Sequence, residues 1–128
     1  MRKNKVKEIL KSGGTVISGW LHIPNTWTAE VMANAGYDTV AVDMQHGLMN
    51  IETAMQMMQV IGTTDAIPLA RCNWNEPGSI MKLLDSGAYG IICPMVNTKE
   101  EWVIINKLTA ICCNVLLRLS YMFNKSLD

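Results

Sequence analysis

Short apolar runs rich in β-branched residues recur along the chain at intervals of about 25 residues. They span residues 15–21, 39–43, 67–71 and 90–93. Continuous apolar runs of this length are typical of strands that are buried on both faces of a parallel sheet. The pattern therefore predicts four buried strands.

Helical patterns fill the intervals between these runs. The predicted helices span residues 28–35, about 50–61, and 77–86. Gly36 can adopt the left-handed conformation that ends the first helix, Asn50 can cap the second, and Pro77 suits the first turn of the third. Alternating strands and helices predict an α/β fold built from right-handed βαβ units around a parallel sheet.

Two architectures fit this alternation. A doubly wound open sheet is normally complete in a chain of 128 residues. A (β/α)8 barrel typically needs ~250 residues, so four βα units would be half of one. Length alone therefore favours the open sheet.

Polar residues follow the predicted strands where each strand ends. Trp20 and His22 end the first, Asp43 and His46 follow the second, and Arg71 ends the third. Because parallel strands end at one edge of a sheet, these side chains should converge there. The alternative is that Asp43 and His46 cap the next helix, while Arg71 pairs with a carboxylate.

The residue types at this edge suit proton transfer beside a carbonyl group. His46 can take a proton near neutral pH, Asp43 or another carboxylate can orient it, and Arg71 can stabilise an oxyanion or enolate. Asp85 lies late in the third helix, where a carboxylate opposes the helix dipole. It is either a solvated acid at the helix end or turned inward to hold His46.

Composition excludes several other classes of protein. The 49% apolar content suffices for one domain, and the 11 basic and 11 acidic residues balance, which argues against nucleic-acid or membrane partners. Polar residues follow the basic start of the chain, so we expect no export signal and a cytoplasmic location. The most apolar segment, residues 108–117, is about half the length of a membrane-spanning helix.

The cysteines and glycines point to no cofactor. Cys72, Cys93, Cys112 and Cys113 lack zinc-type spacing, so we expect buried, reduced thiols. Neither glycine fingerprint for phosphate binding occurs, so no nucleotide cofactor is indicated.

A collinear series of segments resembles the HpcH/HpaI family of metal-dependent class II aldolases. The segments are 18–20 (S-G-W), 29–32 (A-E-V-M), 35–38 (A-G-Y-D), 43–47 (D-M-Q-H-G), 68–71 (P-L-A-R), 74–77 (W-N-E-P), 83–88 (L-L-D-S-G-A) and 90–96 (G-I-I-C-P-M-V). The family fold is a (β/α)8 barrel, so the resemblance overrules the length argument. It implies a partial TIM barrel comprising about the first four βα units.

The resemblance also implies an activity, which is reversible cleavage of a 4-hydroxy-2-oxo acid to pyruvate and an aldehyde without a Schiff base. His46 matches the acid/base group, Arg71 the residue that stabilises the pyruvate enolate, and Asp85 the carboxylate that makes the histidine more basic. Trp20 would shape the aldehyde side. Gln45 departs from the glutamate that many members carry.

The family further implies a divalent ion, Mg, Mn or Co, bound by a glutamate and an aspartate on later strands. We therefore expect no metal ligand in this chain, with Asp43 near the ion without binding it. The partners would be a 2-oxo acid and an aldehyde, and members are usually homo-oligomers.

The resemblance fades near Glu101. Residues 1–101 are therefore interpreted as the N-terminal half of the barrel, and residues 102–128 as a divergent, non-family tail arising from a frameshift or premature stop. Two alternatives remain open. The chain could be a catalytically inactive fragment that lacks the metal site, or an open-sheet binding domain of the flavodoxin kind.

Overall fold

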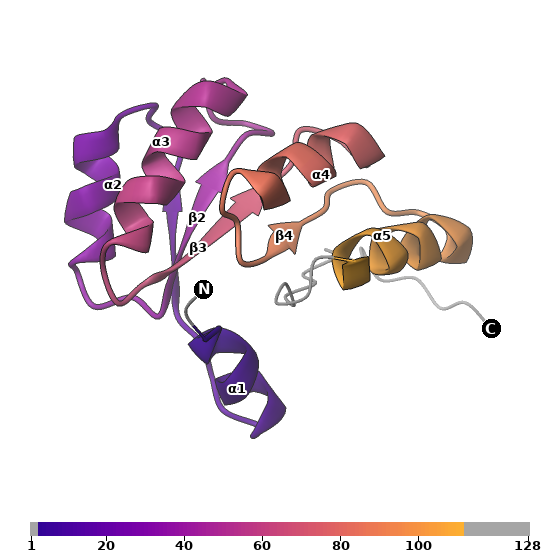
Figure 1. The fold of residues 1–128 in the computed structure, drawn as a ribbon, viewed down its shortest axis with the longest axis horizontal. Helices are drawn as coiled ribbons and strands as arrows, with labels where there is room; N and C mark the ends of the chain where they lie inside the picture. Colours follow the sequence, from indigo (N-terminus) through magenta and orange to yellow (C-terminus); the bar gives the residue numbers. More distant parts are fainter. Residues whose placement is uncertain (1–2, 112–128) are drawn as a thin grey trace.

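A computed structural model describes residues 3–111, and within them each strand is followed by a helix (Figure 1). The elements are α1 (Lys5–Lys11), β1 (Ser18–Leu21), α2 (Thr26–Ala33), β2 (Thr39–Asp43), α3 (Ile51–Gly62), β3 (Ile67–Arg71), α4 (Pro77–Asp85), β4 (Ile91–Ile92) and α5 (Lys99–Ile111). Strands β1 to β4 and the helices after them therefore make four βα units.

The four strands form one parallel sheet in the order β1-β2-β3-β4. Leu21 lies opposite Val42, and Asp43 lies opposite Arg71, so the strands end at one common edge, the carboxyl edge. Strand order that follows chain order is that of a barrel, whereas a doubly wound sheet reverses direction at a switch point. The open sheet favoured by chain length is wrong, and the partial barrel is confirmed.

The two faces of the sheet bury different sets of side chains because side chains alternate along a strand. Helices α2, α3 and α4 cover one face, as Figure 1 shows. On that face Val40 and Val42 pack with helix residues that include Met57, Met58, Ile61 and Leu83. On the other face Val6 of α1 packs with Ala41, Ile67, Leu69 and Ile92.

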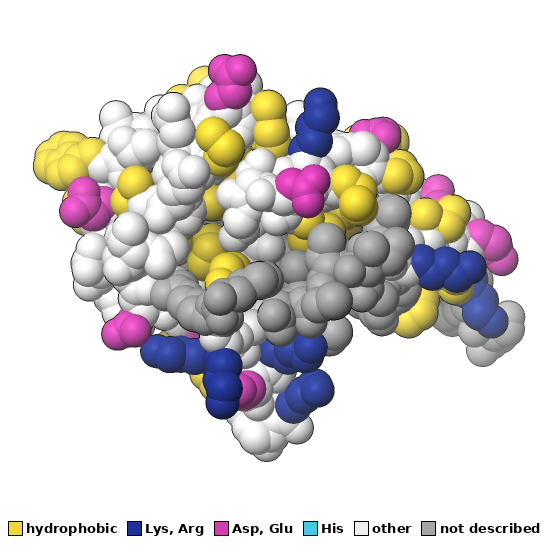
Figure 2. Space-filling model, viewed as in Figure 1, with side chains coloured by type: hydrophobic (Ala, Val, Ile, Leu, Met, Phe, Trp, Pro, Cys, Tyr) yellow, Lys and Arg dark blue, Asp and Glu magenta, His cyan; other side chains and the backbone are white. Residues whose placement is uncertain are grey.

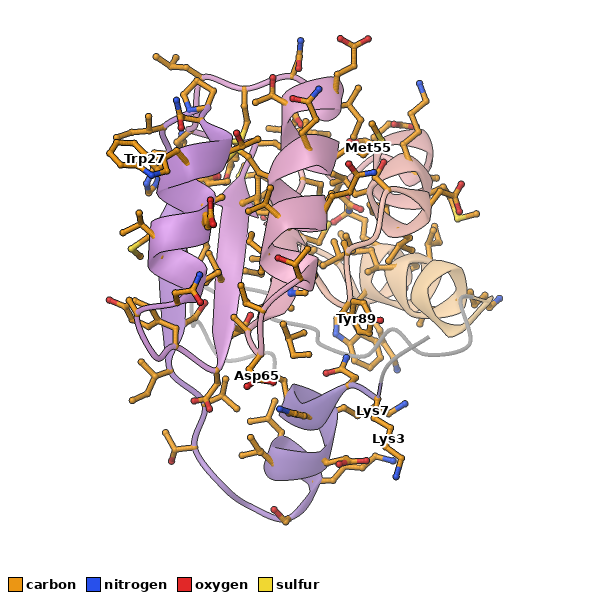
Figure 3. The ribbon with its side chains drawn as sticks, turned by 60° about the vertical axis from the view of Figure 1, so that its left-hand side comes forward. Lys3, Lys7, Trp27, Met55, Asp65 and Tyr89 are labelled. Carbon is orange, nitrogen blue, oxygen red and sulfur yellow. The ribbon has the colours of Figure 1, made fainter. Side chains whose placement is uncertain are left out.

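Helix α1 lies at the opposite edge, where the strands begin, and it was not predicted (Figure 3). Asn4 caps it by accepting a hydrogen bond from the Lys7 amide at 3.2 Å, and it donates to Tyr89 O at 3.0 Å. Lys5 Nζ lies 3.2 Å from Asp65 Oδ1. On the face in Figure 2, basic side chains gather over this helix, remote from the carboxyl edge.

Helix α5 was not predicted either, although its start carries a local signal. Thr98 Oγ1 accepts the Glu101 amide at 3.2 Å, and Glu101 Oε2 accepts the Thr98 amide at 3.2 Å. This reciprocal pair is a capping box. The helix continues through residue 101 to Ile111, while residues 112–128 of the expected tail lie outside the described residues. Within residues 3–111, no helix is long and apolar enough to cross a bilayer.

Candidate active site at the carboxyl edge

Asp43, the last residue of β2, is the centre of a hydrogen-bonded cluster and is fully buried. Its Oδ1 accepts Arg71 Nε at 2.7 Å and the amides of Gln45 and His46 at 3.0 and 3.3 Å. Its Oδ2 accepts Arg71 Nη2 and lies 2.8 Å from His22 Nε2. The carboxylate thus joins three strand ends.

The pKa of Asp43 lies below its ordinary value. Burial by itself would raise the pKa, because it disfavours the charged carboxylate. The hydrogen bond from Arg71, the backbone amides of His46 and Gln45 and the positive charge of Arg71 outweigh that effect. Asp43 is therefore a carboxylate at neutral pH.

Arg71 ends β3 directly opposite Asp43, and its side chain is 19% exposed. The guanidinium carbon Cζ lies over the Trp20 ring of β1, 4.9 Å from its centroid, which is a cation–π contact. A guanidinium carries five N–H donors, and Asp43 takes two of them. No residue between 3 and 111 accepts a hydrogen bond from the other three donors, which are therefore available to an anion within this part of the chain.

The structure brings Trp20, Asp43 and Arg71 together, as predicted. His46 also contacts Asp43, but through its backbone amide and not through its ring. The His46 amide binds Asp43, whereas its exposed imidazole has no hydrogen-bond partner among the described residues. Asp43 therefore does not orient the His46 ring. The alternative interpretation is right that Arg71 pairs with a carboxylate, which is Asp43. It is wrong that Asp43 and His46 cap the next helix, because Asn50 caps α3 and Asp43 accepts amides of the turn before it.

Asp85 lies away from this cluster within one chain. It is the exposed last residue of α4, and the Tyr89 amide shortly after it binds Pro68 O near the start of β3. The helix after β3 runs from the carboxyl edge back to the opposite edge. Asp85 therefore does not turn inward to hold His46 within one chain, because α4 carries it to the edge where the strands begin.

His22 was expected at this edge, but its contact with Asp43 was not predicted. Its side chain is 54% exposed, pairs with Asp43 and stacks on Trp20, with ring centroids 6.4 Å apart and planes at 20°. His22 lies two residues after Trp20, and alternation along β1 puts both on one face. That spacing is the signal that could have found it.

An open apolar pocket of about 610 Å³ adjoins the cluster on the β1 side. Besides Trp20 and His22, it is lined by Leu21, Ile23, Trp27, Thr28, Val31 and Met32. Trp27 is 72% exposed and projects from α2 in Figure 3. The polar cluster thus borders a surface that suits an apolar group.

The cluster does not fit a metal centre. Among residues 3–111, no three His, Cys, Asp or Glu side chains gather closely enough to hold an ion. Both oxygens of Asp43 already accept hydrogen bonds from N–H groups. A cation bound to the same oxygens would be repelled by these donors.

Gly47 fixes the turn that carries His46. A Cβ at Gly47 would overlap the carbonyl oxygen of Asp43, a backbone atom that cannot turn aside, and would lie 2.9 Å from Met49 Cε. We expect Gly47→Ala to lower the free energy of unfolding by about 1–3 kcal/mol, measured by urea denaturation. Gly62→Ala is the matched control, because nothing lies within 4 Å of its Cβ and α3 tolerates alanine. Equal stability of the two variants would contradict this account.

Comparison with known proteins agrees with this architecture. The chain is 45% identical over 98 residues to a hydroxypyruvate/pyruvate aldolase of Rhizorhabdus wittichii, a match that covers 77% of this chain and 39% of that protein. It is 37% identical over 99 residues to a 4-hydroxy-2-oxo-heptane-1,7-dioate aldolase of Salmonella dublin, covering 77% and 38%. The chain therefore spans well under half the length of these relatives.

A solved structure shows the same fold. The crystal structure of an HpcH/HpaI aldolase/citrate lyase family protein from Burkholderia cenocepacia superposes with a TM-score of 0.78 at 25% identity, covering 94% of this chain and 49% of that one. The sequence pattern of the family matches residues 17–113, which reaches past Glu101. Since this match includes most of the chain, the protein belongs to the HpcH/HpaI aldolase/citrate lyase family.

Proposed function

We propose that this chain carries part of the active site of an aldolase that cleaves a 4-hydroxy-2-oxo acid to pyruvate and an aldehyde. The observation that carries the proposal is that the Arg71 guanidinium is held in place and still has N–H donors to offer. A buried carboxylate fixes its guanidinium at the carboxyl edge, while N–H donors remain without an acceptor in the described residues. The names of the relatives, both aldolases, support the same class of reaction.

The proposed roles of Arg71 and His46 follow from where negative charge and the proton go during cleavage. Cleavage breaks the bond between C3 and C4 of the substrate, and its electron pair forms the enolate of pyruvate while the C4 hydroxyl loses its proton and becomes the aldehyde carbonyl. The free N–H groups of Arg71 would stabilise the negative charge on the pyruvyl oxygen. His46, at the same edge with an unpartnered ring, would take the hydroxyl proton.

Trp20 and its pocket would receive the aldehyde part of the substrate. Trp20 contacts Arg71 on one side and lines the apolar pocket on the other. A substrate whose 2-oxo acid group binds Arg71 would therefore direct its remaining carbons toward this pocket. Apolar aldehyde substituents would be preferred there.

The divalent ion implied by the family finds no ligand set among residues 3–111. The predicted influence of Asp85 on His46 likewise has no support from contacts within one chain. The proposal therefore rests on Arg71, Asp43, Trp20 and His46.

Pyruvate release tests this function. The 128-residue chain is incubated with a 4-hydroxy-2-oxo acid and Mn²⁺ or Mg²⁺, and pyruvate is detected through lactate dehydrogenase. Arg71→Lys should lower kcat/KM roughly ten- to a hundredfold, because lysine keeps the charge but loses the forked contact with Asp43.

Lys5→Ala is the control, because it removes a cation that pairs with exposed Asp65, remote from the carboxyl edge, and should leave kcat/KM unchanged. Absence of pyruvate release from the folded chain with either metal would instead support the alternative, a catalytically inactive fragment without the metal site.

A further inference from the structure

Cys72 and Cys93 lie side by side where β3 and β4 end. The last paired residues of the two strands are Arg71 and Ile92, and the Cys72 amide donates to Ile92 O at 3.1 Å. The ladder therefore continues by one position, which sets Cys72 opposite Cys93. Neither thiol has a part in the proposed aldolase chemistry.

The two side chains also share one face of the sheet. Both belong to the helix-covered core, with 0% of Cys72 and 4% of Cys93 exposed. Neighbouring strands lie about 4.8 Å apart. Disulfides need Cα atoms about 4.4–6.8 Å apart, so this pair meets the requirement without a change of register.

The two thiols affect each other's ionisation. Cys72 Sγ donates to Ile92 O at 3.6 Å, and the neighbouring Cys93 thiol, together with burial, raises the pKa of Cys72. The neighbouring Cys72 thiol in turn lowers the pKa of Cys93, although burial and the charge of Glu101 oppose that shift. Cys93 is thus the better nucleophile of the two, because the thiolate is the reactive form.

A small reagent can reach Cys93 by local opening. Strand β4 has only two residues and, in the described part of the chain, pairs with β3 alone at the end of the sheet (Figure 1). Cys93 Sγ lies 3.6 Å from Oδ1 of Asn75, a half-buried residue in the loop before α4. Opening this corner breaks few backbone hydrogen bonds, and such segments open at low free energy.

We propose that Cys72 and Cys93 form an oxidisable dithiol that hydrogen peroxide converts to an intramolecular disulfide. The Cys93 thiolate attacks one peroxide oxygen, the O–O bond breaks, and Cys93 becomes a sulfenic acid as hydroxide leaves. Cys72 sulfur then attacks the Cys93 sulfur and expels the hydroxyl group as water. In sum, two thiols and one peroxide give one disulfide and two waters, and both electrons come from the sulfurs.

Peptide mapping tests the site in a Cys112→Ser/Cys113→Ser chain, which leaves only this pair. The folded protein is treated with hydrogen peroxide, free thiols are alkylated, and the digest is analysed by mass spectrometry. We expect the peptide pair linked through Cys72 and Cys93 to exceed sulfinic and sulfonic products at least tenfold. In urea this ratio should fall at least tenfold, because the unfolded chain does not hold the thiols together.

Single variants in the same background test the order of attack. With Cys72→Ala, Cys93 should accumulate sulfenic acid that dimedone traps. With Cys93→Ala, Cys72 should give several-fold less adduct, because it is fully buried and follows the longer strand β3, whereas Cys93 follows the two-residue strand β4. Circular dichroism of each protein before oxidation confirms that it is folded. The proposal is overturned if the folded double-serine chain gives only intermolecular or over-oxidised products, or if its disulfide yield is the same in urea.

Discussion

Asp43→Ala should lower the free energy of unfolding by about 3 kcal/mol, which is the low end of the range for breaking a buried ion pair. The substitution leaves the Arg71 guanidinium, only 19% exposed, without its counter-charge. It also removes the acceptor of the Gln45 and His46 amides. The low end applies because Arg71 keeps its contact with Trp20 and some contact with solvent. Urea denaturation followed by circular dichroism measures the loss.

Asp65→Ala is the matched control for this substitution. Asp65 also forms an ion pair, with Lys5 at 3.2 Å, but both side chains are largely exposed. Pairs of that kind contribute little to stability, so no measurable change is expected. If Asp43→Ala were no more destabilising than Asp65→Ala, the buried pair would not be what holds the strand ends together.

The contribution of Asp43 should also depend on pH. Because its folded pKa is lowered, the carboxylate stabilises the folded state fully above the unfolded pKa of about 3.9, and this stabilisation is lost as pH falls through the folded pKa. The stability difference between the natural chain and Asp43→Ala should therefore be constant near neutral pH. It should shrink below about pH 4.

The two central strands were predictable to the residue because their sequences carry sharp ends. Residues 39–43 and 67–71 are apolar until a charged residue, Asp43 or Arg71, ends each one. The first strand was predicted too long, from residue 15. The Ile17 amide binds Asp38 Oδ2 at 2.8 Å, so the ladder begins only at Ser18.

The missed helices show where apolar periodicity fails. Helix α1 has seven residues and one buried side chain, Val6, so its core-facing pattern is too short to recognise. The sequence evidence lay in the caps instead. Asn4 precedes α1, and Thr98 and Glu101 form the capping box of α5. Caps are local signals that carry no information about burial.

The location of the site could be predicted from the sequence, but most of its individual contacts could not. Parallel strands had to bring Trp20, Asp43 and Arg71 to one edge, and they do. Which histidine meets Asp43 depends on the turn after β2, which binds Asp43 through its amides and leaves the His46 ring outside. The position of Asp85 was implied by topology, because a helix after a parallel strand must run back toward the other edge.

His46→Ala should lower kcat for pyruvate release about 10²- to 10⁴-fold, the usual contribution of a positioned acid/base group.

His22→Ala is the matched control, because it removes another partly exposed imidazole from the same edge while Arg71 still holds Asp43. If His46 is the base, His22→Ala should cost far less than His46→Ala, and the loss in His46→Ala should occur without a comparable fall in stability. The His22 ring already contacts Asp43, with Nε2 2.8 Å from Oδ2, so His22 is the competing candidate for the base. Loss of kcat in His22→Ala with retention in His46→Ala would transfer the proton-accepting role to the Asp43–His22 pair.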